Sequence, residues 1–251
     1  MKEFFKLFRE STFKGSRATA LDMKDIAKRQ TKHTQHFLLL HSMCHLVLSF
    51  KSDMHSWPNS PLLVLLQIVD PSVLLGNEGT SDTPLHCLAL LADPFEKSTH
   101  VNQLMIAKQL IEHGANVNSV SIPLGATPLH EACFWGNVTN LDFVELLLEA
   151  GADPDAQNHQ GLTPLMITTK HAPGAAKFLL KWHATDVTIT SRSGDSFPAR
   201  VRRTVEYFSD EIARPDNPEQ VQHHFLLQQW RAIEDLSVER GAHDTGITHS
   251  V

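Results

Sequence analysis

The sequence has few cysteines and no membrane-length apolar run. Its three cysteines, Cys44, Cys87 and Cys133, are odd in number and widely spaced, which excludes a disulfide framework and favours a reducing compartment. The apolar stretch at 37–50 has only 14 residues and is interrupted by two histidines, so it is too short to span a bilayer. We therefore expect a cytoplasmic or nuclear protein with no stable membrane insertion and no secretory signal.

Catalytic motifs are missing as well. The sequence contains no G-x-S-x-G elbow, no P-loop and no Rossmann glycine fingerprint, and no nucleophile stands at a suitable spacing from a base. The formal net charge of −6 gives no general affinity for nucleic acid. We expect a non-catalytic protein that needs no cofactor.

What the sequence does contain is an internal repeat. The quartet Thr-Pro-Leu-His begins at Thr83 and again at Thr127, and a third copy at Thr163 ends in methionine. A leucine-rich helical pattern follows each quartet, and Gly114 and Gly151 then open Gly-Ala pairs after the first two. Self-similarity on this scale is typical of a stacked solenoid, a class of protein that rarely performs chemistry and instead presents an extended surface for binding.

The best copy runs from 125 to 158, and each of its signature residues has a structural reason. Thr127 can cap a helix through its hydroxyl, and Pro128 suits the first helical position. A second helix is predicted at 141–149 and should end at Gly151. The apolar face of the first helix comprises Leu129, Ala132 and Cys133.

These features together resemble the ankyrin repeat, a β-turn followed by two antiparallel helices with a T-P-L-H-x-A signature. The resemblance implies an all-α fold: an ankyrin-repeat solenoid of stacked helix-turn-helix units with β-turn tips. It also implies that His86 and His130 bond the backbone of a neighbouring turn and are structural. Met166 replaces this histidine in the third copy, which should weaken the network there.

The spacing departs from the family period of about 33 residues. Thr83 and Thr127 are 44 residues apart, so we expect a loop at 93–100 between two helices. The segment 194–198 stands where a fourth quartet begins, and its second helix is predicted at 225–239, ending at Gly241. The predicted organisation is a basic helical region at 1–58, a degenerate half-repeat at 59–78, ankyrin repeats at 79–122, 123–158 and 159–190, a degenerate repeat with an insertion at 191–245, and a tail at 246–251.

The resemblance also implies where a protein partner binds. In the family, positions one, four and five after the quartet face a groove. These positions are Cys87, Leu90 and Leu91, then Glu131, Phe134 and Trp135, and then Ile167, Lys170 and His171. Two leucines and two aromatic residues of this set would form an apolar ridge, which is typical of an interaction site. The alternative is that the inserted loop or the N-terminal segment covers the ridge. We expect a monomer or a component of a larger complex.

Two other functions stay open at this point. Histidines cluster with Cys44 at 33–45, but Ser42 occupies the glutamate position of an H-E-x-x-H motif, so we predict no metal site and keep zinc regulation as an alternative. Residues 1–33 hold nine Lys or Arg against four Asp or Glu, and they could bind a membrane surface, bind a partner or cover the solenoid end.

A narrower resemblance concerns the C-terminal part. The irregular repeats, the stretch 197–200 and the helix around Trp230 are similar to ankyrin arrays that also carry MORN repeats and a MYND zinc finger. The zinc finger itself is absent, because three scattered cysteines cannot supply its ligands.

Overall fold

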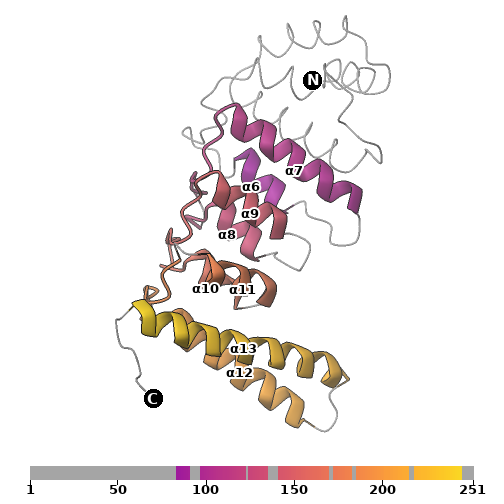
Figure 1. Cartoon of the computed structure of the whole chain (residues 1–251), viewed down its shortest axis with the longest axis vertical. Coiled ribbons are helices and arrows are strands. Elements are labelled where there is room, and N and C mark those ends of the chain that lie inside the picture. Colours follow the sequence, from indigo (N-terminus) through magenta and orange to yellow (C-terminus); the bar gives the residue numbers. More distant parts are fainter. Residues whose placement is uncertain are drawn as a thin grey trace, which may run out of the picture. The chain divides into compact units, whose positions relative to one another are not determined.

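The computed structural model describes most of the chain after residue 82. The described ranges are 83–90, 97–122, 124–134, 141–169, 172–182, 185–214 and 218–244. Within them the chain forms eight helices and no strand (Figure 1), which confirms the all-α prediction. The chain divides into two compact units, Met1–Pro123 and Leu124–Val251, and each is described by itself. The segments predicted at 1–58, 59–78 and 246–251 lie outside the described residues.

The described part of the first unit is one helical pair, α6 (Pro84–Leu90) and α7 (Lys97–Glu112). The two helices pack together, and the side-chain amide of Gln103 donates to the carbonyl of Leu88 at 2.7 Å inside this contact. The predicted loop at 93–100 is wrong in its second half, because the chain is helical from Lys97. Pro94 is the last helix breaker before this segment, so nothing after it prevents helix formation.

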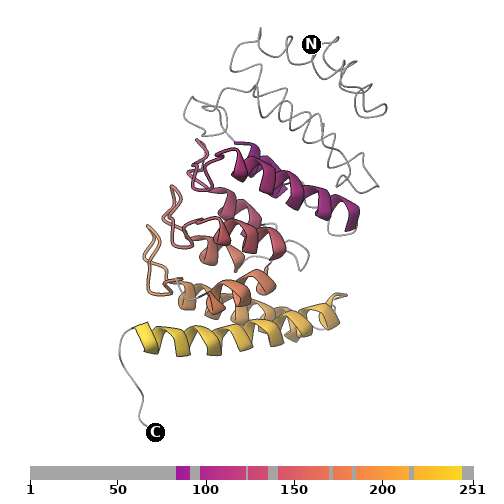
Figure 2. The same ribbon diagram turned by 45° about the horizontal axis from the view of Figure 1, so that its top comes forward.

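The second unit repeats the helical pair three times. Its elements are α8 (Pro128–Phe134), α9 (Leu141–Glu149), α10 (Pro164–Thr168), α11 (Pro173–Lys181), α12 (Phe197–Ala213) and α13 (Gln220–Asp244). Helix α10 packs on α8 and on α12, while α11 packs on α9 and on α13. The first helices of successive pairs therefore form one layer and the second helices another, as Figures 1 and 2 show.

Apolar side chains at helical spacing form the core between these layers. Helix α9 buries Phe143, Val144, Leu147 and Leu148. Each such side chain contributes about 2 kcal/mol by leaving water. Helices α8 and α10 have only seven and five residues and would not persist alone, so packing against neighbours is what stabilises them.

Glycine ends α9 as predicted. Gly151 has φ 88°, its N–H donates to Leu148 O at 3.0 Å, and the N–H of Ala152 donates to Leu147 O at 2.9 Å. This is the Schellman arrangement, which needs a residue that tolerates positive φ. The corresponding two bonds recur after α7, with Gly114 in the same place.

Turns at one edge of the second unit tie each repeat to the next. Three bonds of this kind are His159 N–H to Leu124 O at 2.8 Å, Arg192 N–H to Gln160 O at 3.0 Å, and Asp186 N–H to the Asp155 carboxylate at 2.9 Å. The partners stand about one repeat period apart, so the turns continue the stacking that the helices begin.

The quartet histidine links two repeats as well. Nδ1 of His130 accepts the Thr127 N–H at 3.1 Å, and Nε2 lies 2.9 Å from the carbonyl oxygen of Leu162. The structural role expected for this histidine is therefore observed. In the third copy, where methionine replaces it, the Thr163 hydroxyl instead accepts the N–H of Met166 at 3.3 Å.

The last repeat differs from its prediction. No long loop is inserted; instead the two helices are lengthened, and α12 and α13 lie side by side in both views (Figures 1 and 2). The predicted second helix at 225–239 is too short, and Gly241 does not end it. Glycine costs a helix only about 1 kcal/mol relative to alanine. Packing of α13 outweighs that cost: Trp230 and Ile233 are buried, and the guanidinium of Arg240 donates to Trp182 O at 3.0 Å.

Candidate functional site

The groove position at the end of α6 is exposed. Leu90 has 47% of its surface open to solvent, whereas Leu85 and Leu88 in the same helix are completely buried. Cys87, one turn earlier, is half-buried. Leu90 is thus the leucine of α6 that lies at the surface.

The groove positions of α8 and α10 are half-buried. They are Glu131 and Phe134 on α8 and Ile167 on α10, and the two helices belong to the same layer. Leu91, Trp135, Lys170 and His171 lie outside the described residues. The predicted apolar ridge therefore stays a prediction.

A fourth set of groove positions was missed in the sequence. Ser196 caps α12 by accepting the N–H of Ala199, just as Thr163 accepts the N–H of Met166 before α10. Ser196 is thus the first residue of a fourth quartet, and the same counting rule then gives Arg200, Arg203 and Thr204. In the sequence, the serine at the threonine position is the sign of this fourth quartet. Phe197 and Pro198 stand where the other copies have proline and leucine, so the alignment with those copies was not recognised.

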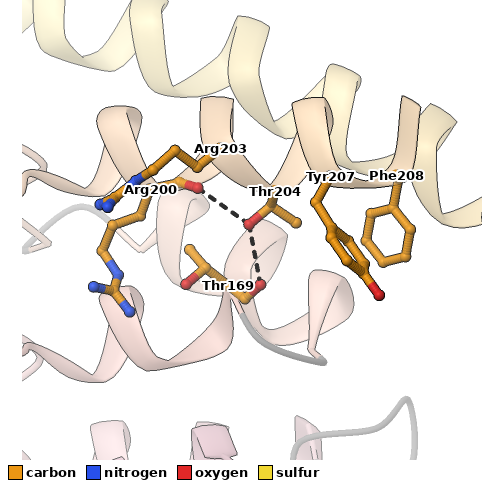
Figure 3. A pocket seen from close by; sticks show the side chains of 6 residues that line it. All are labelled: Thr169, Arg200, Arg203, Thr204, Tyr207 and Phe208. Carbon is orange, nitrogen blue, oxygen red and sulfur yellow. Dashed lines mark hydrogen bonds between the residues drawn. The ribbon is translucent and has the colours of Figure 1, made fainter. Parts of the chain in front are cut away.

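These three residues line a surface pocket of about 330 Å³ (Figure 3). Thr169, Tyr207 and Phe208 complete the lining. The Thr204 hydroxyl lies 3.3 Å from the carbonyl of Thr169 and 3.1 Å from that of Arg200, so it fixes α12 beside the end of α10. Tyr207 is 56% exposed and meets the ring of Phe208 edge-on, with centroids 5.3 Å apart.

One carboxylate serves both arginines of the pocket. Asp195 Oδ2 lies 2.7 Å from Nη2 of Arg203 and 3.8 Å from Nη1 of Arg200. The hydrogen bond from Arg203 holds the pKa of Asp195 below its ordinary value, so this carboxylate is ionised at neutral pH. Burial lowers the pKa of Arg200, because desolvation disfavours the cation, although Asp195 opposes the effect.

Metal ligands and cysteine thiols are the remaining groups with the potential for chemistry among the described residues. Among them, no three His, Cys, Asp or Glu side chains are grouped so as to hold a metal ion. Cys133 is completely buried, and burial raises the pKa of its thiol, which disfavours the reactive thiolate. The histidine cluster at 33–45 lies outside the described residues. No helix in the described ranges has the length and apolar character to cross a membrane.

Paired short and long helices, joined by turns that bond to one another one period apart, define a helical repeat protein. The family model for ankyrin repeats (3 copies) matches residues 59–158 and 99–191, over half of the chain. The chain belongs to the ankyrin-repeat family. Proteins of this family are generally non-enzymatic, and their repeats generally mediate protein–protein interaction.

Curated relatives match over about a quarter of this chain. The chain is 39% identical over 71 residues to the mouse (Mus musculus) 2-5A-dependent ribonuclease, a match that covers 28% of this chain and 9% of the ribonuclease and lies in the repeat region. It is 42% identical over 69 residues to the putative ankyrin repeat protein FPV232 of fowlpox virus, which covers 28% of this chain and 13% of that protein. The Caenorhabditis elegans homologue of ankyrin repeat and LEM domain-containing protein 1 is 41% identical over 70 residues, which are 28% of this chain and 9% of that protein. The chain thus matches only a small part of each relative's length, and the comparisons do not support the narrower MYND-type resemblance.

Proposed function

We propose that this chain is a non-catalytic interaction scaffold or adaptor, which binds a protein partner through the groove formed by its first helices. The observation that carries the proposal is Leu90, a leucine 47% exposed at a groove position of a helix whose other leucines are fully buried. A partner that covers this leucine would gain the free energy of removing its exposed apolar surface from water. The proposed contact residues are Leu90, Leu91, Glu131, Phe134, Trp135, Ile167, Lys170 and His171.

The groove positions differ in chemistry from copy to copy, which supports selective binding. Position four is Leu90 in the first clear copy, Phe134 in the second, Lys170 in the third and Arg203 in the fourth. Apolar and aromatic residues can anchor a partner, and the basic residues can select for charge. The site of action proposed with this function is the cytoplasm or the nucleus.

The test is affinity capture from a cell extract, with bound proteins identified by mass spectrometry. The wild-type chain is compared with a groove variant, Leu90→Ser together with Trp135→Ala, and with a control variant, Glu145→Ala together with Lys177→Ala. The control residues are exposed on the second helices α9 and α11. We expect the groove variant to lose at least one specific partner that the control retains, while both keep wild-type circular dichroism. Equal capture by the three proteins would contradict the proposal.

The alternatives concern segments outside the described residues. Zinc regulation through 33–45 predicts stoichiometric zinc in the purified protein, and a membrane-surface role predicts that 1–33 binds anionic liposomes. Both remain predictions, as does the MYND-type resemblance.

A further inference from the structure

The pocket on α12 has a cationic end. Arg200 and Arg203 face a single carboxylate, Asp195, so one positive charge is in excess. Nε of Arg200 is buried, and no acceptor in the described part of the chain bonds it. The side chain of Arg203 is 57% exposed and can reach a ligand without moving the core. A guanidinium held in this way recognises an oxyanion through parallel N–H bonds.

The other end of the pocket is aromatic. Figure 3 shows the two arginines at one end, Thr204 in the middle, and Tyr207 with Phe208 at the other. Thr204 directs its hydroxyl toward backbone carbonyls, so the charged donors of the pocket for an anion are the two arginines. Tyr207 offers an exposed ring face for an apolar group.

The volume limits what the pocket can take. About 330 Å³ is at the lower end of the range for small-ligand sites, which suits one or two side chains better than a long segment. The pocket also lies at groove positions one, four and five of the fourth repeat, where a bound protein partner would pass.

We propose that this pocket binds an acidic side chain of the protein partner, with the Asp or Glu carboxylate on Arg203 and Arg200 and a neighbouring apolar side chain on Tyr207. The proposal rests on the proposed function, because it assumes that the partner lies in the groove. The proposed function alone does not restrict the sequence of the partner. This inference does, because it requires an Asp or Glu close to an apolar residue in the bound segment.

The charge balance favours a carboxylate over a phosphate. A carboxylate carries one negative charge, which matches the single excess positive charge of the pocket. A phosphate group carries about −1.5 to −2 at neutral pH, which exceeds this charge, and it would meet stronger repulsion from the ionised Asp195 carboxylate than a singly charged carboxylate does. Nucleic acid is disfavoured by the same carboxylate and by the net charge of −6.

Replacing Asp195 should change the affinity for an acidic peptide in the opposite direction to replacing the arginines. This carboxylate competes with the partner's carboxylate for Arg203. Asp195→Asn removes the competing charge with little change of shape, so binding of an acidic peptide should become tighter. A merely structural role for the Asp195–Arg203 pair predicts unchanged or weaker binding instead.

The chain also offers a matched control for Arg203. Arg202 precedes it on the same helix and is 68% exposed, but its guanidinium faces Glu234 of α13 at 3.6 Å. Arg202→Gln and Arg203→Gln thus remove the same charge from the same helix, and only the second removes it from the pocket.

The experiment uses a random dodecapeptide display library selected on the full chain, with the Arg200→Gln/Arg203→Gln protein as counter-selection. Enriched peptides are then made synthetically, and their affinity is measured by fluorescence anisotropy. We expect enriched peptides to share an Asp or Glu beside an apolar residue. Arg203→Gln should weaken binding about tenfold, as should replacing the peptide's Glu by Gln, and the two changes together should cost little more than either alone. Arg202→Gln should change affinity less than twofold.

Three outcomes overturn the proposal. The first is a selection that enriches no peptide over the counter-selected protein, or peptides without acidic residues. The second is equal affinity loss for Arg202→Gln and Arg203→Gln. The third is tighter binding of a phosphoserine version of the peptide than of the Glu version. If cellular partners depend on Leu90 and Trp135 but not on Arg203, this inference fails while the proposed function stands; if they depend on none of the three, the proposed function fails.

Discussion

His130 Nε2 lies 2.9 Å from the carbonyl oxygen of Leu162, which belongs to the next repeat. The Nδ1 atom of the same ring accepts the backbone N–H of Thr127, so it carries no proton and Nε2 must be the donor. One neutral imidazole therefore accepts a backbone N–H at the start of a helix in its own repeat and donates to a backbone carbonyl in a turn of the next repeat. This arrangement explains why a histidine that is only 1% exposed is not a sign of catalysis.

Replacing His130 by alanine should lower the stability of the chain. The change leaves the Thr127 N–H and the Leu162 carbonyl without this partner, and it also opens a cavity. The Leu162 carbonyl keeps the hydrogen bond from the N–H of Asn158, so the Thr127 N–H is the group left unsatisfied. An unsatisfied buried polar group costs about 1–3 kcal/mol and the cavity adds to this, so we expect a loss of about 3 kcal/mol in the free energy of unfolding. Urea denaturation followed by circular dichroism measures it.

Met166→Leu is the control for this prediction, because methionine occupies the same quartet position in the third copy and bears no comparable side-chain bond to a turn. A swap that conserves volume should cost less than about 1.5 kcal/mol. Equal losses for the two variants would mean that the hydrogen bonds of His130 contribute little to stability.

The second prediction compares two glycines with similar backbone geometry. Gly151 has φ 88° and Gly161 has φ 73°. A Cβ added at Gly151 meets nothing within 4 Å, whereas one at Gly161 would lie 2.6 Å from the backbone nitrogen of Arg192. That nitrogen donates to Gln160 O in the bond that joins two turns, so it cannot move freely.

Gly151→Ala should therefore cost about 1 kcal/mol, the strain of a left-handed alanine. Gly161→Ala should cost about 3 kcal/mol, since overpacking adds to the same strain. The urea midpoints of the two variants test this difference. Losses of the same size would indicate that the backbone at 191–192 shifts to accommodate the added methyl group with no loss of stability.

Local features of the sequence were sufficient to predict the helix boundaries of the best copies. The start of α10 at Pro164 and the end of α9 before Gly151 depend on backbone preferences that one or two residues decide. The fold class followed because these signals recur in the same order. The end of α13 was not predictable in this way. Gly241 is a local stop signal, but packing with residues far away in the sequence, including Trp182, overrides it.

The candidate site was predictable only in part, for a related reason. The counting rule assigns Leu90 and Ile167 to the proposed groove, but it needs a recognisable quartet, and the fourth begins with Ser196–Phe197. Only the hydrogen bond from the N–H of Ala199 to the Ser196 hydroxyl establishes that register. The pairing of Asp195 with Arg203 is three-dimensional information as well, because nothing in the spacing separates Arg203 from Arg202.

The third prediction concerns thiol reactivity. Cys133 is 0% exposed, and burial raises the pKa of its thiol, so the thiolate is rare and inaccessible in the folded chain. Cys87 is only half-buried. On treatment with iodoacetamide at neutral pH, we expect Cys87 to be alkylated much faster than Cys133, as measured by peptide mass spectrometry. In urea the two rates should become similar. Rapid alkylation of native Cys133 would mean that α8 opens locally, contrary to its packing.

The fourth prediction separates core from surface within a single helix. Leu88 is completely buried in α6, and Leu90 two residues later is 47% exposed. Leu88→Ala should cost about 2–5 kcal/mol, because it removes buried methyl groups and leaves a cavity. Leu90→Ala should change the free energy of unfolding by less than about 0.5 kcal/mol, as is usual for exposed positions.

The same two variants then distinguish stability from binding. If Leu90 contacts a partner, Leu90→Ala weakens capture of that partner although the variant is as stable as the wild type. Leu88→Ala should reduce capture only as far as it reduces the folded fraction. On warming, the Leu88→Ala protein should therefore lose the partner at a lower temperature than the wild type and Leu90→Ala lose their folded structure. A Leu90→Ala protein that is destabilised like Leu88→Ala would show that Leu90 belongs to the core, and the groove surface would then have to be built from the remaining positions.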